Sequence, residues 1–253
     1  MGPCEQPGAI AAIENRPGIG RPTATSGSPC VVPPGKVLIE AGYRYERTDG
    51  AAGTSILQVF PLAMLRAGLG DHDEVLLLPP ALAYRTGANL GGVFVPRDGA
   101  EDVGIGFKRM LHDRPAYQDA AGLFYTAPTG APGATGFSAG SSTYTLSYTG
   151  TFPVGARFGL STTQQAIVVP QFLSYQPSLT LGYSLSHNAS VLATEQITTP
   201  LSANGGTGNR GLLEFQCAIS AHAVLDAEYE VNFLPGPPSF RQQAFGIGGA
   251  WLL

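Results

Sequence analysis

The stretch Leu173–Ser186 alternates strictly between two kinds of side chain. Every second residue from Leu173 onward is leucine, tyrosine or proline, and the residues between them are Ser, Gln, Thr or Gly. A period of two places the two sets on opposite sides of an extended strand. The stretch is longer than the usual five or six residues, roughly, of a soluble strand, and tyrosines lie near both ends of its apolar side. It predicts either a membrane-spanning β-barrel strand or one long strand of a soluble sandwich with its polar side in water.

The same alternation recurs along most of the chain after residue 36. Thr143–Phe152 is a second regular case, with Tyr144 and Leu146 on one side and threonines and a serine on the other. Together these segments predict about twelve strands, an even number as expected of a closed single-chain barrel. The predicted strands lie near residues 36–46, 57–69, 74–84, 102–111, 117–126, 143–152, 157–163, 173–186, 190–199, 213–220, 224–233 and 245–253.

The connections between the predicted strands fall into two classes. A membrane barrel has short periplasmic turns opposite longer outer loops, whereas a soluble sandwich has no reason to sort its connections in this way. The sequence therefore predicts an all-β fold: a transmembrane antiparallel β-barrel of the bacterial outer membrane, with short periplasmic turns and longer extracellular loops. The short connections lie at 70–73, 112–116, 153–155, 186–188 and 220–223, and the longer ones at 48–55, 86–100, 128–141, 165–171, 201–209 and 234–240.

The composition fits a barrel better than a helical membrane protein. Charged residues make up 13% of the 253 residues, about half of the usual share in a soluble domain. No stretch approaches the roughly 18 uninterrupted apolar residues of a transmembrane helix. The net charge of −4 and the absence of a Lys/Arg stripe argue against a nucleic-acid partner.

Residues 1–35 are rich in Pro and Gly and follow neither a helical nor a strand period. We expect an irregular arm there, followed by a barrel over residues 36–253. Cys4 and Cys30 bracket the arm, and two interpretations stay open: two unpaired thiols, or a disulfide that stabilises the fold by roughly 3 kcal/mol and implies an oxidising compartment. Cys217 is predicted to be a small apolar wall residue. The first thirty residues or so lack a signal peptide's basic start and apolar run, so a barrel requires that the chain be a mature form.

The side chains opposite the apolar face are expected to line the interior. Two interpretations of them stay open: a wall of cross-strand salt bridges and hydrogen bonds, or a polar channel whose acidic excess on the later strands favours cations or neutral polar solutes. The predicted interior residues are Glu40, Arg44, Glu46, Arg66, Glu74, Asp102, Lys108, Arg157, Gln176, Glu214, Asp226, Glu228 and Glu230. The predicted lipid-facing residues are Tyr144, Leu146, Tyr148, Leu173, Tyr175, Leu179, Leu181, Tyr183, Phe215, Tyr229 and Trp251.

No persuasive active site is apparent, and we do not expect an enzyme. A hydrolase needs a Ser–His pair oriented by a third group, but His72, His112, His187 and His222 all fall in predicted short turns. His72 lies among acidic residues, where a solvated turn is a simpler interpretation than a metal site. The glycines of Gly104–Gly106 lack the strand–turn–helix context of a nucleotide-binding loop, so we expect neither a cofactor nor a metal.

Five short segments, in this order along the chain, resemble those of a family of bacterial outer-membrane barrels assigned to transport, including barrels linked to the MetA pathway of phenol degradation. The resemblance covers roughly residues 30–253, and it implies a signal peptide, an outer-membrane barrel and the passage of small molecules, with no catalytic residues to transfer. The chain departs from such barrels at its last residue, Leu253, where they usually end in a Phe that the assembly machinery reads. The segments are Ala41–Tyr45, Glu101–Lys108, Ala127–Gly130, Asp226–Tyr229 and Phe245–Gly249.

These observations predict a passive channel or transporter for small molecules, aromatic or hydrophobic ones among them. The alternative is a structural or docking barrel that anchors outer-membrane or periplasmic partner proteins and transports nothing. Membrane lipid is the expected partner of the outer wall.

Overall fold

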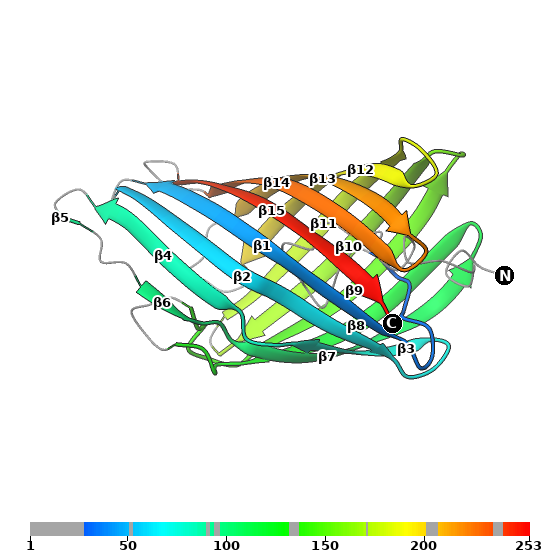
Figure 1. Ribbon diagram of the computed structural model, residues 1–253, viewed down its shortest axis with the longest axis horizontal. Helices are drawn as coiled ribbons and strands as arrows, with labels where there is room; N and C mark the ends of the chain where they lie inside the picture. The colour runs from blue at the N-terminus through cyan, green and yellow to red at the C-terminus, as the bar shows by residue number, and fades with distance from the viewer. Residues whose placement is uncertain are drawn as a thin grey trace.

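The computed structural model is an antiparallel β-sheet that closes into a barrel of strongly tilted strands (Figure 1). It describes residues 28–50, 53–89, 92–93, 97–131, 137–170, 172–200, 207–234 and 240–253. The strands are β1 (Val37–Gly50), β2 (Gly53–Gly68), β3 (Asp73–Leu78), β4 (Leu82–Asn89), β5 (Gly92–Val93), β6 (Arg97–Ala100), β7 (Val103–Arg114), β8 (Tyr117–Ala127), β9 (Thr143–Val154), β10 (Phe158–Val169), β11 (Phe172–Ser184), β12 (Ala189–Pro200), β13 (Gly208–Ser220), β14 (Ala223–Leu234) and β15 (Phe240–Leu252). β1 pairs with β15 on one side and with β2 on the other, which closes the sheet. No helix of the described residues is long and apolar enough to cross a membrane.

In the described part of the chain, these fifteen elements make twelve barrel strands. β3 and β4 are one strand in a single register, because Leu77 pairs with Leu65 of β2 and Leu82 pairs with Phe60 of β2. β6 and β7 are likewise one strand, since they pair with β4 and β3 respectively. β5 pairs only with the far end of β4. The predicted barrel of about twelve antiparallel strands is confirmed.

Prolines explain why the third barrel strand is interrupted. Pro79 and Pro80 separate β3 from β4, and Pro61 lies on the facing part of β2. Proline has no backbone N–H and cannot donate to a ladder. On the other side of the gap, the N–H of Glu101 donates to the carbonyl of Ala81 at 2.8 Å, which keeps the next strand attached.

Several strands extend beyond the ends that the sequence pattern predicts. The pattern predicts a connection over 165–171, but β10 continues to Val169, because the β-branched run Ile167–Val169 suits a strand. β1 and β2 likewise continue into the predicted loop 48–55, and β4 and β6 into the predicted loop 86–100. These three predictions of loop bounds are wrong. Longer connections remain at 128–142, 201–207 and 235–239, opposite the short turns at 69–72, 115–116, 155–157, 185–188 and 221–222.

The two faces of the wall differ as the period of two requires. On β11, Ser174 and Thr180 are 2% and 5% exposed, whereas Leu179 and Leu181 are 53% and 49% exposed. Aromatic side chains pair on the wall near both ends of the strands, and aromatic girdles of this kind mark the two interfaces of a membrane barrel. The ring pairs are Tyr125–Tyr144 towards the longer connections, and Tyr117–Phe152 and Phe158–Tyr183 towards the short turns.

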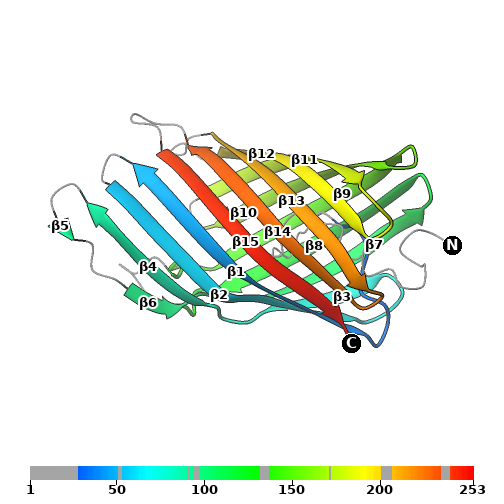
Figure 2. The ribbon, with the colours of Figure 1, turned by 45° about the horizontal axis from the view of Figure 1, so that its top comes forward.

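Residues 28–34, which we call the strap, precede β1 and lie inside the barrel at the short-turn end, where the chain also ends (Figure 2). The arm predicted over residues 1–35 is therefore described only from Ser28 onward. Cys30 in the strap is 2% exposed, but Cys4, its predicted disulfide partner, lies outside the described residues, so that bridge stays a prediction. Cys217 on β13 is a half-buried free thiol.

Candidate functional site: a charged interior and a hydroxyl-lined cavity

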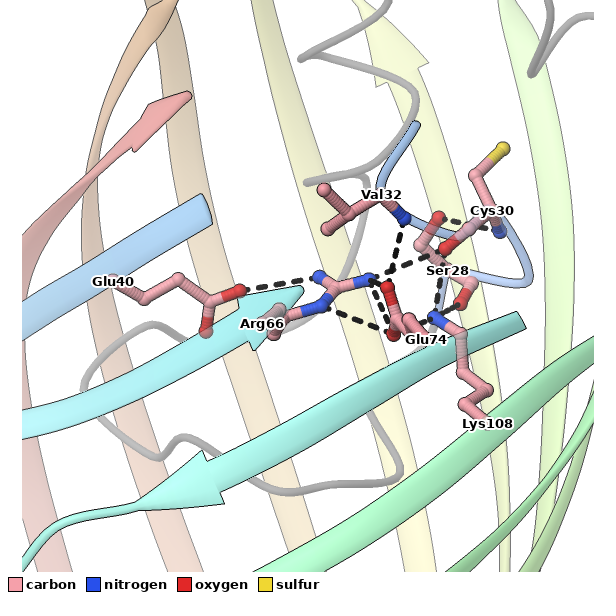
Figure 3. Close-up of polar contacts among 7 residues, drawn as sticks. All are labelled: Ser28, Cys30, Val32, Glu40, Arg66, Glu74 and Lys108. Atoms are coloured by element: carbon pink, nitrogen blue, oxygen red, sulfur yellow. Dashed lines mark hydrogen bonds and ion pairs between the residues drawn. The ribbon is translucent and has the colours of Figure 1, made fainter. Parts of the chain in front are cut away.

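Four charged side chains of the wall meet inside the barrel beside the strap, and we call them the basal cluster (Figure 3). Arg66 on β2 donates to Glu40 on β1 (Nη1–Oε1 3.1 Å) and to Glu74 on β3 (Nη2–Oε1 2.8 Å). Lys108 on β7 lies 3.1 Å from the same oxygen of Glu74. None of the four is more than 4% exposed. Two acids and two bases compensate one another, which is how a buried site tolerates charge.

Side chains of the basal cluster hold the backbone of the strap. Lys108 donates to the carbonyl oxygens of Ser28 (3.1 Å) and Cys30 (2.7 Å). Arg66 Nη2 also donates to the carbonyl oxygen of Cys30, at 3.2 Å. The N–H of Val32 donates to Glu74 Oε2 at 2.8 Å. Buried backbone polar groups need partners, and charged groups of the wall supply them here (Figure 3).

The strap also lies directly on the backbone of β2. Pro34 forms a β-bridge with Gly68, and the N–H of Gly35 donates to the Gly68 carbonyl at 3.2 Å. A Cβ at Gly68 would lie 2.2 Å from the Pro33 carbonyl oxygen and 2.3 Å from that of Val32. Only glycine therefore permits this approach. The apolar contacts of the strap are those of Cys30 and Val32 with Leu38, Val224 and Ala250 of the wall.

A second ion network lies on β1, β13 and β14. Arg44 contacts Glu46 at 3.0 Å and both Glu228 and Glu230 at 3.4 Å. Arg210 on β13 reaches Glu230 at 2.8 Å. Arg44 and Arg210 thus compensate two of the carboxylates of β14, Glu228 and Glu230, within the wall.

Asp102, between β6 and β7, draws the connection between β8 and β9 into the barrel. Its two carboxylate oxygens accept from the N–H groups of Gly130 and Ala139, both at 2.8 Å. Phe137 of this connection is 5% exposed, and the guanidinium of Arg85 lies 5.7 Å from the centre of its ring. Part of this connection consequently packs against inward-facing residues of β2 and β4.

Strands β8 to β12 line the other side of the interior with hydroxyl and amide groups. A cavity of 290 Å³ lies at their short-turn end. Hydroxyl groups such as those of Thr151, Ser161 and Thr180 line it, together with apolar residues such as Pro153 and Leu192. No carboxylate occurs among the described residues that line it, and its one guanidinium is that of Arg157. The hydroxyl and amide pairs of these strands are Thr149–Thr163 (3.1 Å), Thr151–Ser161 (3.2 Å), Thr180–Thr194 (2.8 Å) and Gln176–Gln196 (3.3 Å).

Most of the predicted interior residues are buried. Glu46 and Gln176 are half-buried. Arg157 is the exception, because it lies in the turn between β9 and β10, exposed, with Nη1 3.5 Å from the Tyr183 hydroxyl. Arg157 also lines the cavity at the short-turn end, so its assignment to the interior stays a prediction. The buried set is Glu40, Arg44, Arg66, Glu74, Asp102, Lys108, Glu214, Asp226, Glu228 and Glu230.

The predicted lipid-facing residues lie on the opposite face of the wall. Tyr183 is half-buried, because Phe158 packs on its ring at 4.8 Å. All the others are between 37% and 53% exposed. These are Tyr144, Leu146, Tyr148, Leu173, Tyr175, Leu179, Leu181, Phe215, Tyr229 and Trp251.

The histidines form no metal site in the part of the chain that the structure describes, where no group of three or more His, Cys, Asp or Glu converges. His112 is not in a turn, because β7 continues to Arg114, and this prediction is wrong. Its Nδ1 lies 2.8 Å from Asp119, which also accepts hydrogen bonds from Tyr117 and Tyr148. His72, His187 and His222 lie in the short turns, as predicted.

Comparison with known proteins relates this barrel to channels. No known protein family and no curated protein matches the sequence. Among solved structures, an outer membrane channel from Pseudomonas putida F1 is similar, with a TM-score of 0.68 and 13% identity over 88% of this chain and 97% of that chain. The NanC porin (TM-score 0.54, 7% identity, 83% of this chain and 98% of that chain) and the KdgM porin (0.52, 8%, 84% and 98%) are also similar. At these identities the similarity concerns the fold. The chain has the fold of bacterial outer-membrane channels and porins, and with its apolar outer wall it is a barrel of that membrane in contact with lipid.

Proposed function

We propose that the protein is a passive channel that lets small molecules cross the bacterial outer membrane. The observation that supports this most strongly is the cavity of 290 Å³ inside a closed barrel whose inner face is polar and whose outer face is apolar. The named structural neighbours are channels and porins, which agrees with transport and gives no support to an enzyme.

The solute class that we propose is small and uncharged, and includes aromatic and hydrophobic molecules. The resemblance of segments such as Glu101–Lys108 to barrels linked to phenol degradation points in this direction. The contacts of Arg44 and Arg210 with Glu228 and Glu230 also favour it over a cation channel, because the carboxylates already have cationic partners in the wall.

Purified protein in a planar lipid bilayer is expected to give discrete, passive conductance steps, because a water-filled path through a closed barrel carries ions as well as solutes. The same protein in liposomes should admit small neutral solutes in an osmotic swelling assay. Protein denatured and not refolded is the matched control.

Folded protein that inserts in the bilayer, gives no conductance and admits no solute would contradict the channel. Gel mobility that changes on boiling reports folding independently of transport. If such protein instead co-purifies stably with an outer-membrane or periplasmic protein, a docking barrel becomes the better account.

A further inference from the structure

The strap and the cavity occupy different halves of the barrel at the short-turn end. The strap makes its polar contacts with β2, β3 and β7 and its apolar contacts with β1, β14 and β15. The cavity is lined by β8 to β12 and by the turns between them. The two sets of strands do not overlap in the order around the sheet.

We propose that the strap is a fixed part of the pore wall, which closes one half of the short-turn mouth and confines permeation to the hydroxyl-lined cavity in the other half. We further propose that this passage selects small solutes without net charge. The inference rests on the proposed channel function and its uncharged solute class, and it specifies the route and the part of the wall that confines it.

The contacts of the strap are those of a fixed element. Its carbonyl and N–H groups are bonded to Lys108, Arg66 and Glu74, all nearly inaccessible to solvent, and these side chains are bonded to one another. Displacing the strap would leave buried charges of the basal cluster with fewer partners, which is unfavourable. The strap therefore belongs to the resting wall, and solutes have to pass beside it.

The chemistry of the cavity favours uncharged solutes. Hydroxyl groups such as those of Thr151, Ser161 and Thr180 both donate and accept, so they can exchange hydrogen bonds with water or with a solute hydroxyl. They carry no charge of their own that would attract a cation or an anion, so hydrated ions of either sign can pass without a preference. The four charged residues of the basal cluster, on the strap side, are already paired with one another within the wall.

Filling the cavity tests the route. Thr180→Phe places an aromatic ring in the cavity. Leu179→Phe places the same ring on the outward face of the wall, where the side chain of Leu179 is 53% exposed. We expect a several-fold loss of bilayer conductance, and of glycerol and arabinose uptake by liposomes, for Thr180→Phe, with wild-type values for Leu179→Phe. Equal conductance and uptake in the two variants would overturn the proposed route.

Moving the strap tests its part in the wall. Gly68→Ala inserts a Cβ 2.2 Å from a strap carbonyl, whereas a Cβ at Gly70, in the adjacent turn, meets nothing within 4 Å. We expect a larger conductance, and passage of larger neutral sugars, for Gly68→Ala but not for Gly70→Ala. Identical size limits in the two variants would overturn the role of the strap.

Three readouts separate this inference from the channel function itself. Heat-dependent gel mobility shows that each variant folds. If the wild-type protein conducts but the two members of each variant pair behave alike, the inference is refuted and the channel function stands. If the folded wild-type protein does not conduct, the channel function itself is refuted. A reversal potential in a KCl gradient close to that of an unselective pore is expected, and strong preference for either ion contradicts an uncharged passage.

Discussion

Replacing Arg66 by Ala is expected to lower the free energy of unfolding by about 3–5 kcal/mol, the range for breaking a buried ion pair by removing one partner. Arg66 is 0% exposed and bonds to Glu40 and Glu74, so its removal takes away cationic partners from two buried carboxylates. Urea unfolding in detergent micelles measures the change, with fluorescence of Trp251, the chain's one tryptophan, as the probe.

The matched control for this prediction is Arg47→Ala. Arg47, on β1, also forms an ion pair, with Asp49 at 3.0 Å, but the two side chains are 50% and 42% exposed. An exposed pair contributes little, because water screens it. We therefore expect a far smaller change for Arg47→Ala, and similar losses in the two variants would contradict the structural role assigned to the basal cluster.

Replacing Leu179 by Arg is expected to cost about 2–4 kcal/mol of folding free energy in a lipid bilayer, the range for an arginine on the lipid face near the midplane of a barrel. Leu179 is 53% exposed in the middle of β11, on the outward face. Equilibrium refolding into phospholipid bilayers from denaturant measures this loss.

Two further arginine variants supply the controls for Leu179→Arg. Leu185→Arg lies on the exposed face beyond the short-turn end of β11, near the interface, where the cost falls to about 0–1 kcal/mol. Thr180→Arg points into the barrel beside the cavity of 290 Å³, and it should cost far less than Leu179→Arg. Equal losses at Leu179 and Thr180 would contradict the assignment of the two faces.

The wall of this barrel is predictable from the sequence because its signal is local. Along Leu173–Ser186, apolar side chains alternate with small polar ones, as expected of a strand with one face towards lipid and one towards the interior. The direction in which each side chain points therefore follows from its immediate neighbours in the sequence. The same alternation identifies Glu40 and Glu228 as inward-facing, although they are far apart in the chain. It fails at His112, because β7 continues to Arg114 through the predicted turn.

The strap and the cavity are not predictable in this way. Val32 bonds to Glu74 through its backbone N–H, and Ser28 and Cys30 bond to Lys108 through their carbonyl oxygens. Every residue type except proline has these backbone groups, so no side-chain pattern identifies them. The one sequence signal is Gly68 at the end of an otherwise well-filled strand, and its meaning appears only when the Pro33 carbonyl is found against it.

The proposal that solutes cross through the interior, past the hydroxyl groups of β11, is tested most directly by thiol accessibility at two adjacent residues. In a Cys217→Ala background, Thr180→Cys places a thiol at the cavity and Leu179→Cys places one on the lipid face. A small, uncharged, water-soluble methanethiosulfonate reagent added during bilayer recording should reduce the conductance of Thr180→Cys and leave Leu179→Cys and the background protein unchanged. Conductance that is insensitive to the reagent at Thr180, or that falls equally at Leu179, would contradict permeation through this interior.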